Sequence, residues 1–232
     1  MIPKLIHQTA KTHELPADCV PYVETLKALH PDWTYKLWTD ADNLELITQR
    51  VPEFLEVYTK LPKNIMRADV VRYVMMYTHG GLYLDTDYEM LKPFDLTRHD
   101  VVLPIEITDE QGNLTRVANS FFASVPGHPL WRMMIDDLIA HPPLGPEIDV
   151  IEATGPAFVT RMYRRARDAG MIIYTPPREL FNPTTPRLRR DYEAIVSRGQ
   201  SYGIHHCFGS WRDFDARHKL KATVWRMLRK FV

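Results

Sequence analysis

Two aspartates stand one residue apart in the stretch GGLYLDTDYEM, residues 80–90. A buried strand would normally continue with valine or isoleucine, yet this one leads into Asp85 and Asp87. Residues two apart in an extended strand point to the same side, so we expect both carboxylates to face one space together with Tyr83. Because two close carboxylates repel each other, they must share a proton or a cation. The pair therefore indicates a bound cation at the carboxyl end of a strand, where open α/β sheets bind ligands.

Several kinds of structure contain paired acids. A solvated turn is the simplest, but the apolar strand and the double glycine before it count against that alternative. A calcium loop of the EF-hand type needs glycine at its sixth position and glutamate at its twelfth, where this chain has Met90 and Leu96. A phosphatase with an aspartyl nucleophile usually has threonine or valine where this chain has Glu89. The pattern favours Mg²⁺ or Mn²⁺ bridged to a diphosphate, as in enzymes that use nucleotide-sugars.

Composition narrows the class of protein. The chain has 232 residues, 45% hydrophobic and 25% charged, which is ordinary for one globular domain. Lys plus Arg and Asp plus Glu both number 29, which argues against a nucleic-acid partner held by phosphate attraction. The two cysteines, Cys19 and Cys207, lack CxxC spacing and favour a reducing compartment. We see no signal peptide in the first residues and no apolar run of ~20 residues, so we expect a cytoplasmic protein.

Regular elements must hold the aspartates at a rigid edge. Strand and helix patterns alternate through the first ~90 residues, which indicates a single α/β domain with a mainly parallel sheet flanked by helices. We expect strands at 3–9, 32–40, 82–87, 100–106 and 119–125, and helices at 19–30, 65–79, 128–140, 156–169 and 216–231.

Capping and loop signals refine these elements. We expect Asp40 to cap the helix that follows it, and Asn64 to cap the long apolar helix before the aspartates. Gly80 lies just past the end of that helix, where a left-handed residue is favoured. The proline-rich stretches 142–146 and 175–190 are expected to be ordered loops.

Six segments carry a resemblance to a known family. They are IPKLIHQT at the start, WTD at 38–40, RADVVRY at 67–73, GGLYLDTD at 80–87, TGPAFVT at 154–160 and HHCFGSW at 205–211. In this order they resemble glycosyltransferase family 32, the DXD sugar-binding group, which includes fungal mannosyltransferases and bacterial capsule or lipid glycosyltransferases. Clostridial glucosylating toxin domains are more distant relatives. The resemblance spans residues 2–211 and implies a GT-A fold, a Rossmann-like sheet with the metal motif at the donor site.

The resemblance implies a metal site built on the paired aspartates. Asp85 matches the first motif acid, which lies near the sugar and ribose and supports the metal. Asp87 matches the acid that ligates the metal directly. His206 matches the distal metal ligand, and its neighbour His205, which would face the opposite way in a strand, is the alternative. The implied cofactor is Mn²⁺ or Mg²⁺.

The resemblance also implies contacts with a nucleotide-sugar donor. His7 and Gln8 fall where the first strand ends against the nucleotide, and Trp211 matches a tryptophan of a loop that closes over the donor. Asn119 resembles a family asparagine near the sugar site, although an ordinary asparagine at the start of a strand is the alternative.

Asp69 and Arg72 stand three apart on the long apolar helix and therefore share a face. A solvated ion pair is the ordinary interpretation, but the apolar neighbours favour a buried pair that needs further hydrogen-bond partners, such as sugar hydroxyls. In the family the matching acid contacts the donor sugar and the matching arginine contacts the sugar or diphosphate. The chain departs from the family pattern at Ala68 and at residues 9–11, which bears on donor choice.

These assignments define a functional hypothesis. We expect a retaining, metal-dependent glycosyltransferase that moves a hexose from a UDP- or GDP-sugar to a hydroxyl of a lipid or glycan acceptor. The residues expected to act in catalysis are Asp69, Arg72, Asp85 and Asp87. Specificity is expected in the loops 108–116 and 175–200. The alternatives are a non-catalytic module that binds nucleotide-sugars and, less favoured, a metal-dependent phosphatase.

The end of the chain differs in character from the domain of residues 1–211. Residues 212–232 form an expected basic amphipathic helix, with apolar residues at helical spacing at Leu220, Val224, Leu228 and Phe231. Such a helix lies on an anionic membrane or docks on its own domain. We therefore expect a peripheral contact with the inner face of a membrane through residues 216–232, or an intramolecular contact in its place.

Overall fold

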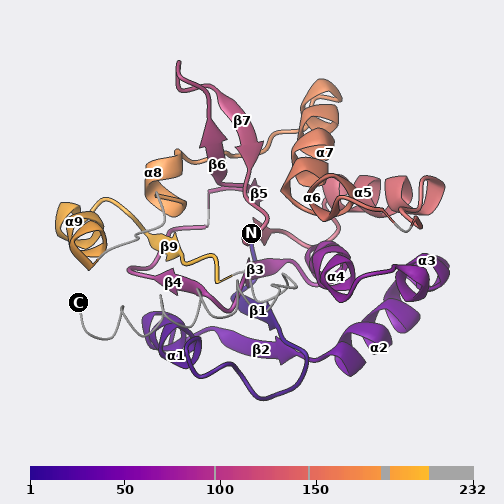
Figure 1. Cartoon of the computed structure of the whole chain (residues 1–232), viewed down its shortest axis with the longest axis horizontal. Helices are drawn as coiled ribbons and strands as arrows, with labels where there is room; N and C mark the ends of the chain where they lie inside the picture. The colour runs from indigo at the N-terminus through magenta and orange to yellow at the C-terminus, as the bar shows by residue number, and fades with distance from the viewer. Residues whose placement is uncertain (97, 146, 184–188, 209–232) are drawn as a thin grey trace.

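A computed structural model describes residues 1–96, 98–145, 147–183 and 189–208, with only the backbone described at 189 and 190. The central five-stranded sheet has the order β2-β1-β3-β8-β5 (Figure 1). Its strands are β1 (Leu5–Thr9), β2 (Thr34–Trp38), β3 (Gly81–Leu84), β5 (Val101–Val102) and β8 (Phe121–Ser124). β1 is parallel to β2 and β3, whereas β8 is antiparallel to β3 and β5. The parallel part comes from the first half of the chain, as its alternating pattern predicted, but the sheet as a whole is mixed and not mainly parallel as expected.

Two smaller antiparallel sheets flank this one. β4 (Tyr88–Met90) pairs with β9 (Gly203–His205), and β6 (Ile105–Thr108) pairs with β7 (Leu114–Val117) as a projecting hairpin. The helices are α1 (Val20–Leu29), α2 (Asp40–Arg50), α3 (Leu55–Lys60), α4 (Asn64–Thr78), α5 (Pro129–Ala140), α6 (Val150–Ala153), α7 (Pro156–Asp168), α8 (Arg178–Phe181), α9 (Arg189–Arg198) and the 3₁₀ helix η1 (Pro52–Phe54).

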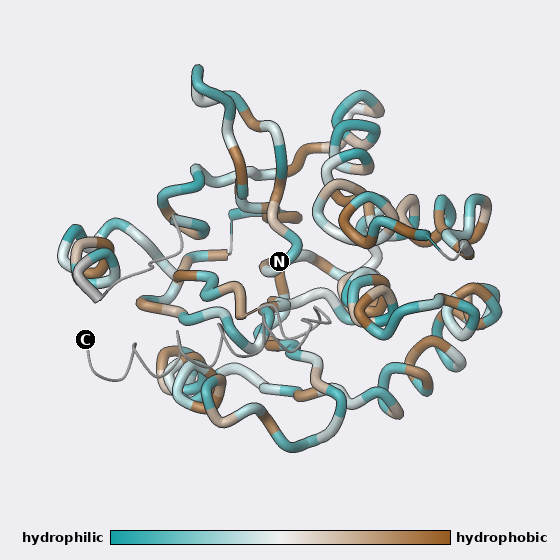
Figure 2. Tube along the Cα trace, in the orientation of Figure 1, coloured by the Kyte–Doolittle hydropathy of each residue, from teal (hydrophilic) through white to brown (hydrophobic). Residues whose placement is uncertain are grey.

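Both faces of the central sheet are covered, and the strand alternation decides which residues face which layer. Tyr83 and Phe122 pack with α2 to α7 on one face, on the right in Figure 1. Leu82, Leu84 and Phe121 pack on the other face with α1, the β4–β9 pair and α8. Apolar residues concentrate along the central strands and in α4 (Figure 2). The fold is therefore a three-layer arrangement whose middle layer ends at the paired aspartates.

The double glycine lets α4 turn directly into β3. Gly80 and Gly81 have φ angles of +63° and +92°, a region that suits glycine. A Cβ on Gly81 would lie 2.4 Å from the carbonyl oxygen of Leu5, so only glycine lets β3 approach β1 this closely. All residues of β3 are buried, and the strand ends at Leu84. The sheet thus fixes the position of Asp85 at its edge.

Some expected features differ in the structure. Thr39, and not Asp40, caps α2, because its hydroxyl accepts from the Asp42 N–H while the Asp42 carboxylate accepts from the Thr39 N–H. Asn64 is the first residue of α4 rather than its cap, which is Lys63 without a side-chain bond. The expected loops also contain regular elements: β6–β7 around the 108–116 loop, and α8 and α9 within 175–200.

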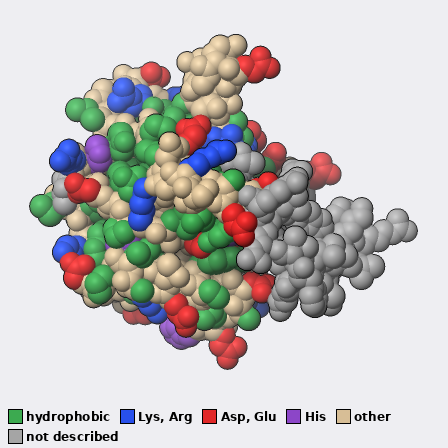
Figure 3. Space-filling model, turned by 90° about the vertical axis from the view of Figure 1, so that its left-hand side faces the viewer, with side chains coloured by type: hydrophobic (Ala, Val, Ile, Leu, Met, Phe, Trp, Pro, Cys, Tyr) green, Lys and Arg blue, Asp and Glu red, His purple; other side chains and the backbone are tan. Residues whose placement is uncertain are grey.

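The surface and the chain end complete the description. On the face seen in Figure 3, acidic and basic side chains are interspersed without a continuous patch of one sign. The predicted helix at 216–231, the boundary between 211 and 212, and Trp211 all lie outside the described residues. Within the part of the chain that is described, we find no helix with the length and apolar character needed to cross a membrane.

Candidate metal and donor site

Asp85 and Asp87 lie in a tight turn between β3 and β4, and not in the extended strand that the sequence predicted for 82–87. The Tyr88 N–H donates to the Asp85 carbonyl oxygen at 3.0 Å, which closes the turn. The Asp85 N–H donates to the Ser120 carbonyl at 3.0 Å, and Gln8 Nε2 donates to the Asp85 carbonyl at 3.1 Å. Turn geometry and these anchors, rather than strand pleating, bring the two carboxylates to one side.

Asp85, Asp87 and His205 form a cluster whose potential ligand atoms all lie within 4.8 Å of one another. His205 Nε2 lies 3.2 Å from Asp87 Oδ1 and 3.8 Å from Asp85 Oδ2. The β4–β9 pairing, in which Tyr88 is opposite His205, carries the imidazole to the aspartates. Two carboxylates and one imidazole form a donor set that suits Mn²⁺, and carboxylates suit Mg²⁺. These residues therefore fit the divalent cation that the motif implies.

The structure brings His205 to the aspartates, whereas the sequence interpretation had chosen His206. His206 Nε2 instead lies 2.9 Å from Glu89 Oε2, and its ring stacks on Tyr22 with centroids 4.6 Å apart. Adjacent residues of an extended segment face opposite sides, so only one of the two histidines reaches Asp85 and Asp87. The register of β4 against β9, a long-range pairing, decides which one it is.

The segment after β9 wraps around Asp87. The Phe208 N–H donates to Asp87 Oδ2 at 2.8 Å, and the His206 N–H donates to the Asp87 carbonyl at 3.0 Å. Burial acts to raise the pKa of Asp87, but the hydrogen bonds from His205 and the Phe208 N–H outweigh it and hold that pKa below its usual range. Asp87 is thus kept as a carboxylate, the form that binds a cation.

Arg72 joins the paired aspartates to Asp69. Both Arg72 and Asp69 are buried, so the solvated ion pair considered from the sequence is not what the structure has. The Arg72 guanidinium lies 3.2 Å from Asp69 Oδ1 and 3.2 Å from Asp85 Oδ1, and it also donates to the carbonyl oxygens of Ala68 and Asn119. Asp85 Oδ1 further accepts from the Tyr83 hydroxyl at 2.8 Å, which leaves Oδ2 on the side of His205.

Asp69 is held by donors from distant parts of the chain. Asn119 Nδ2 donates to its Oδ1 at 2.8 Å and Thr154 Oγ1 donates to its Oδ2 at 2.9 Å. Burial raises the pKa of Asp69 to about 7, against the opposing effect of the Arg72 charge and these hydrogen bonds. Asn119 therefore lies beside the predicted sugar-contacting pair. Thr154 and Tyr83 were not singled out as site residues, although both belong to segments that carried the family resemblance.

His7 and Gln8 are buried and form hydrogen bonds inside the protein. His7 is fully buried, with Nε2 2.9 Å from the Gly80 carbonyl oxygen and Nδ1 accepting from Trp38 Nε1 at 2.9 Å. Burial lowers the pKa of His7 to about 4, so this ring is neutral. Gln8 is also buried, and its Oε1 accepts from the Tyr35 hydroxyl at 2.9 Å. The structure thus gives both residues a structural place behind the aspartates and does not bring their side chains to an open surface.

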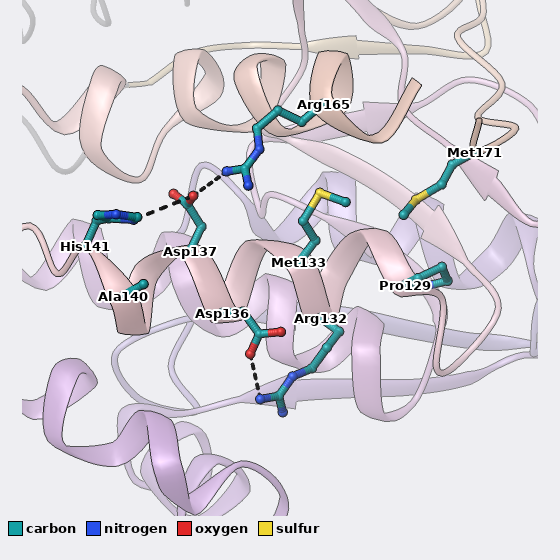
Figure 4. A pocket seen from close by; sticks show the side chains of 9 residues that line it. All are labelled: Pro129, Arg132, Met133, Asp136, Asp137, Ala140, His141, Arg165 and Met171. Atoms are coloured by element: carbon teal, nitrogen blue, oxygen red, sulfur yellow. Dashed lines mark hydrogen bonds and ion pairs between the residues drawn. The ribbon is translucent and has the colours of Figure 1, made fainter. Parts of the chain in front are cut away.

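A shallow pocket of about 450 Å³ lies elsewhere, between α5 and α7 (Figure 4). Its charged groups are already paired, Asp137 with Arg165 and Asp136 with Arg132. None of its lining residues belongs to the clusters around Asp87 and Asp69. We therefore place the candidate site at the turn between β3 and β4 that carries Asp85 and Asp87, called the aspartate turn below, and not in this pocket.

Comparison with solved structures identifies the fold. The structure aligns with one described as PaToxG Glycosyltransferase with a TM-score of 0.58 and 15% identity, covering 99% of this chain and 87% of that chain. The chain has the GT-A glycosyltransferase fold, as the resemblance implied. Residues 16–104 match the family described as glycosyltransferase sugar-binding region containing DXD motif. The match lies within the segment that carries the paired aspartates, and the predicted resemblance to glycosyltransferase family 32 is confirmed.

Curated relatives agree with this family. Inositol phosphoceramide mannosyltransferase 3 of Schizosaccharomyces pombe is 33% identical over 223 residues, covering 93% of this chain and 57% of the relative. Mannosyl phosphorylinositol ceramide synthase CSH1 of Saccharomyces cerevisiae is 29% identical over 204 residues, covering 87% of this chain and 53% of the relative. The chain therefore spans little more than half the length of these relatives.

Proposed function

We propose that this chain is a metal-dependent, retaining glycosyltransferase that moves a hexose from a UDP- or GDP-sugar to a hydroxyl group of a lipid or glycan acceptor. The observation that carries the proposal is the cluster of Asp85, Asp87 and His205 at the carboxyl end of β3, with ligand atoms within 4.8 Å of one another. Because the curated relatives are named as mannosyltransferases, mannose is the hexose that we propose to test first.

Each residue of the site has a place in this chemistry. Asp87 and His205 would hold the divalent cation, and Asp85 presents Oδ2 to the same space because Tyr83 and Arg72 occupy its Oδ1. When bound, the cation supplies positive charge that stabilises the departing diphosphate. The acceptor hydroxyl attacks on the face from which the diphosphate leaves, so the configuration at the anomeric carbon is kept. The departing phosphate takes the acceptor proton.

The buried pair on α4 is proposed to orient the sugar. Arg72 is fixed between Asp69 and Asp85, so its guanidinium cannot turn without breaking two ion pairs. Asp69 is fixed at both oxygens by Asn119 and Thr154. Asp85, which Arg72 holds through Oδ1 and which is partly exposed, is therefore fixed in position before the donor binds, and this lowers the entropic cost of orienting the donor.

The test is donor binding followed by donor turnover. We expect a GDP- or UDP-hexose to raise the unfolding temperature in the presence of Mn²⁺, since a ligand that binds the folded state stabilises it. We then expect slow hydrolysis of that donor without acceptor, which stops when a chelator is added. Binding without hydrolysis would favour the silent binding module, and release of phosphate from simple monoesters would favour the phosphatase.

The acceptor is proposed to be presented at a lipid surface. Two of the relatives are named for mannosylation of inositol-containing sphingolipids, and residues 216–232, outside the described part, have a basic amphipathic sequence. We expect the full chain to sediment with vesicles that contain anionic lipids, and a chain ended after residue 213 to remain in the supernatant. Equal sedimentation of both chains would remove the membrane contact from the proposal.

A further inference from the structure

Both cysteines of the chain lie beside the aspartate turn, although they are far apart in the sequence. Cys19 is buried at the N-cap of α1, close to the Thr86 side chain between the two aspartates. Cys207 is exposed and follows β9, with its sulfur 3.3 Å from Nδ1 of His205. Cys207 therefore touches a member of the metal cluster from behind, whereas Cys19 does not touch a ligand side chain.

The two nitrogens of His205 face different partners. Nε2 lies 3.2 Å from Asp87 Oδ1 and 3.8 Å from Asp85 Oδ2, inside the metal cluster. Nδ1 lies on the far side of the ring, against the sulfur of Cys207. The same sulfur is 3.7 Å from the backbone carbonyl oxygen of His205, which accepts a hydrogen bond from the thiol. The thiol can therefore donate to the carbonyl while its sulfur faces the imidazole.

A histidine that binds a cation through Nε2 must carry its proton on Nδ1. The partner of Nδ1–H therefore decides which tautomer is present and how the ring is oriented. We propose that Cys207 is a positioning residue, which accepts a hydrogen bond from His205 Nδ1–H and so presents Nε2 to the divalent cation. This inference rests on the metal site of the proposed function and adds to it a residue that does not itself bind the metal.

The backbone at Cys207 has a second, separable effect. Its φ angle is +51°, in the left-handed region that side chains other than glycine and asparagine seldom adopt. This bend lets the Phe208 N–H reach Asp87 Oδ2 at 2.8 Å, just after the His206 N–H has reached the Asp87 carbonyl. Glycine at this position would keep the bend without strain and remove the sulfur. A glycine variant therefore separates the thiol contact from the backbone conformation.

The experiment measures Mn²⁺ affinity without donor, by electron paramagnetic resonance of the free ion, for the wild type and for Cys207→Ala, Cys207→Gly and Cys207→Ser. Removing a hydrogen-bond partner of a metal-binding histidine typically costs 10–100-fold in metal affinity, so we expect Kd to rise about tenfold or more in the alanine and glycine variants. The serine variant, whose hydroxyl can accept the same bond, should recover most of the affinity. Cys19→Ala controls for losing a thiol at this edge and should stay within about threefold of the wild type.

A second readout follows the tautomer itself. With Mg²⁺ bound, long-range ¹H–¹⁵N spectra of the imidazoles, assigned with His205→Gln, should show His205 protonated at Nδ1 in the wild type. The Cys207→Gly variant should show a mixture of tautomers or a signal broadened by ring motion, while its unfolding temperature stays at or above the wild-type value. Unchanged Mn²⁺ affinity in Cys207→Gly, or a wild-type ring protonated at Nε2 with metal present, would overturn the positioning role. A wild type that binds no Mn²⁺ would overturn the proposed function together with it.

Discussion

His205 Nε2 lies 3.2 Å from Asp87 Oδ1, although 118 positions separate the two residues along the chain. The antiparallel pairing of β4 with β9 makes this contact, since Tyr88 is directly opposite His205. One acid of the aspartate turn is therefore held by a segment from the far end of the described chain. The properties of the proposed site should depend on both segments, and the following predictions separate their contributions.

Replacing Asp87 by asparagine should abolish metal-dependent turnover. The amide would keep the size of the side chain but lose the negative charge, and losing a direct ligand should raise the Mn²⁺ Kd by more than the ~100-fold that a residue behind a ligand costs. Isothermal titration with Mn²⁺ and donor hydrolysis would measure both effects. Asp168→Asn, at the exposed end of α7, is the matched control and should behave as the wild type. Turnover of Asp87→Asn within a few-fold of the wild type would show that Asp87 is not a ligand.

The two neighbouring histidines should respond differently to alanine. His205→Ala removes a group of the metal cluster, so we expect Mn²⁺ affinity to fall at least about tenfold. His206→Ala removes a ring stacked on Tyr22 and bonded to Glu89, so we expect a lower unfolding temperature with Mn²⁺ affinity within a few-fold of the wild type. The reverse order of affinities would support His206, the ligand that the sequence interpretation selected.

Asp69 should make the stability of the fold depend on pH. Burial raises its pKa in the folded state to about 7, whereas an unfolded aspartate has a pKa of about 3.9. Between these two values the folded state binds more protons than the unfolded state, so the free energy of unfolding falls as pH rises through this window. Asp69→Asn carries no such proton. Urea unfolding at pH 5 and pH 8 should therefore show the wild type losing stability relative to this variant, and parallel pH profiles would contradict the raised pKa.

Arg72 should be costly to remove because the buried Asp69 and the partly exposed Asp85 both depend on it. Arg72→Met leaves Asp69 and Asp85 without their shared cation, and breaking a buried ion pair typically costs about 3–5 kcal/mol. Arg116→Met, which breaks a half-exposed pair with Glu106, should cost less than about 1 kcal/mol. Chemical unfolding of both variants measures the difference. Equal losses would mean that the environment of Arg72 is far more polar than its burial suggests.

The close approach of β3 to β1 gives a test of the fold itself. Gly81→Ala combines a left-handed backbone with a Cβ 2.4 Å from the Leu5 carbonyl oxygen, so we expect a loss of more than about 4 kcal/mol. Gly112→Ala has a similar φ of +84° but nothing within 4 Å, so only the left-handed penalty of about 1–2 kcal/mol applies. Thermal and urea unfolding would compare the two. A Gly81→Ala protein as stable as Gly112→Ala would show that β1 and β3 can separate at little cost.

The sequence predicted those parts of the site that depend on local patterns. The apolar helix before the double glycine and the parallel strands of the first half follow from residues close together in the chain. Asp85 and Asp87 do converge, but through a turn anchored by Ser120 and Gln8 and not through the extended strand that the local pattern indicated. The choice between His205 and His206 depends instead on the register of β4 against β9, which local alternation cannot fix. The bond from Thr154 to Asp69 spans 85 positions and likewise has no local signal.

Short helices and strands were also difficult to predict from the sequence. The hairpin β6–β7 and the one-turn helix α8 contain too few residues to show a clear period, and α8 lies in a proline-rich stretch that indicated a loop. At the start of α2, the sequence Thr-Asp-Ala-Asp offers several capping residues, and only the reciprocal bonds of Thr39 and Asp42 show which one is used.

β9 pairs with β4 and takes no part in the central five-stranded sheet. During synthesis, a nascent chain acquires Asp85 and Asp87 long before His205, so the proposed metal site is complete only when nearly all of the described chain has left the ribosome. In the finished protein, one proteolytic cut between Arg198 and Gly203, where α9 ends and β9 begins, would sever the covalent route to His205 while the backbone of the main sheet stayed intact. The central sheet and the imidazole of the proposed metal site thus belong to different segments of the chain. A cut between them would act on the proposed site and not on the backbone of the sheet.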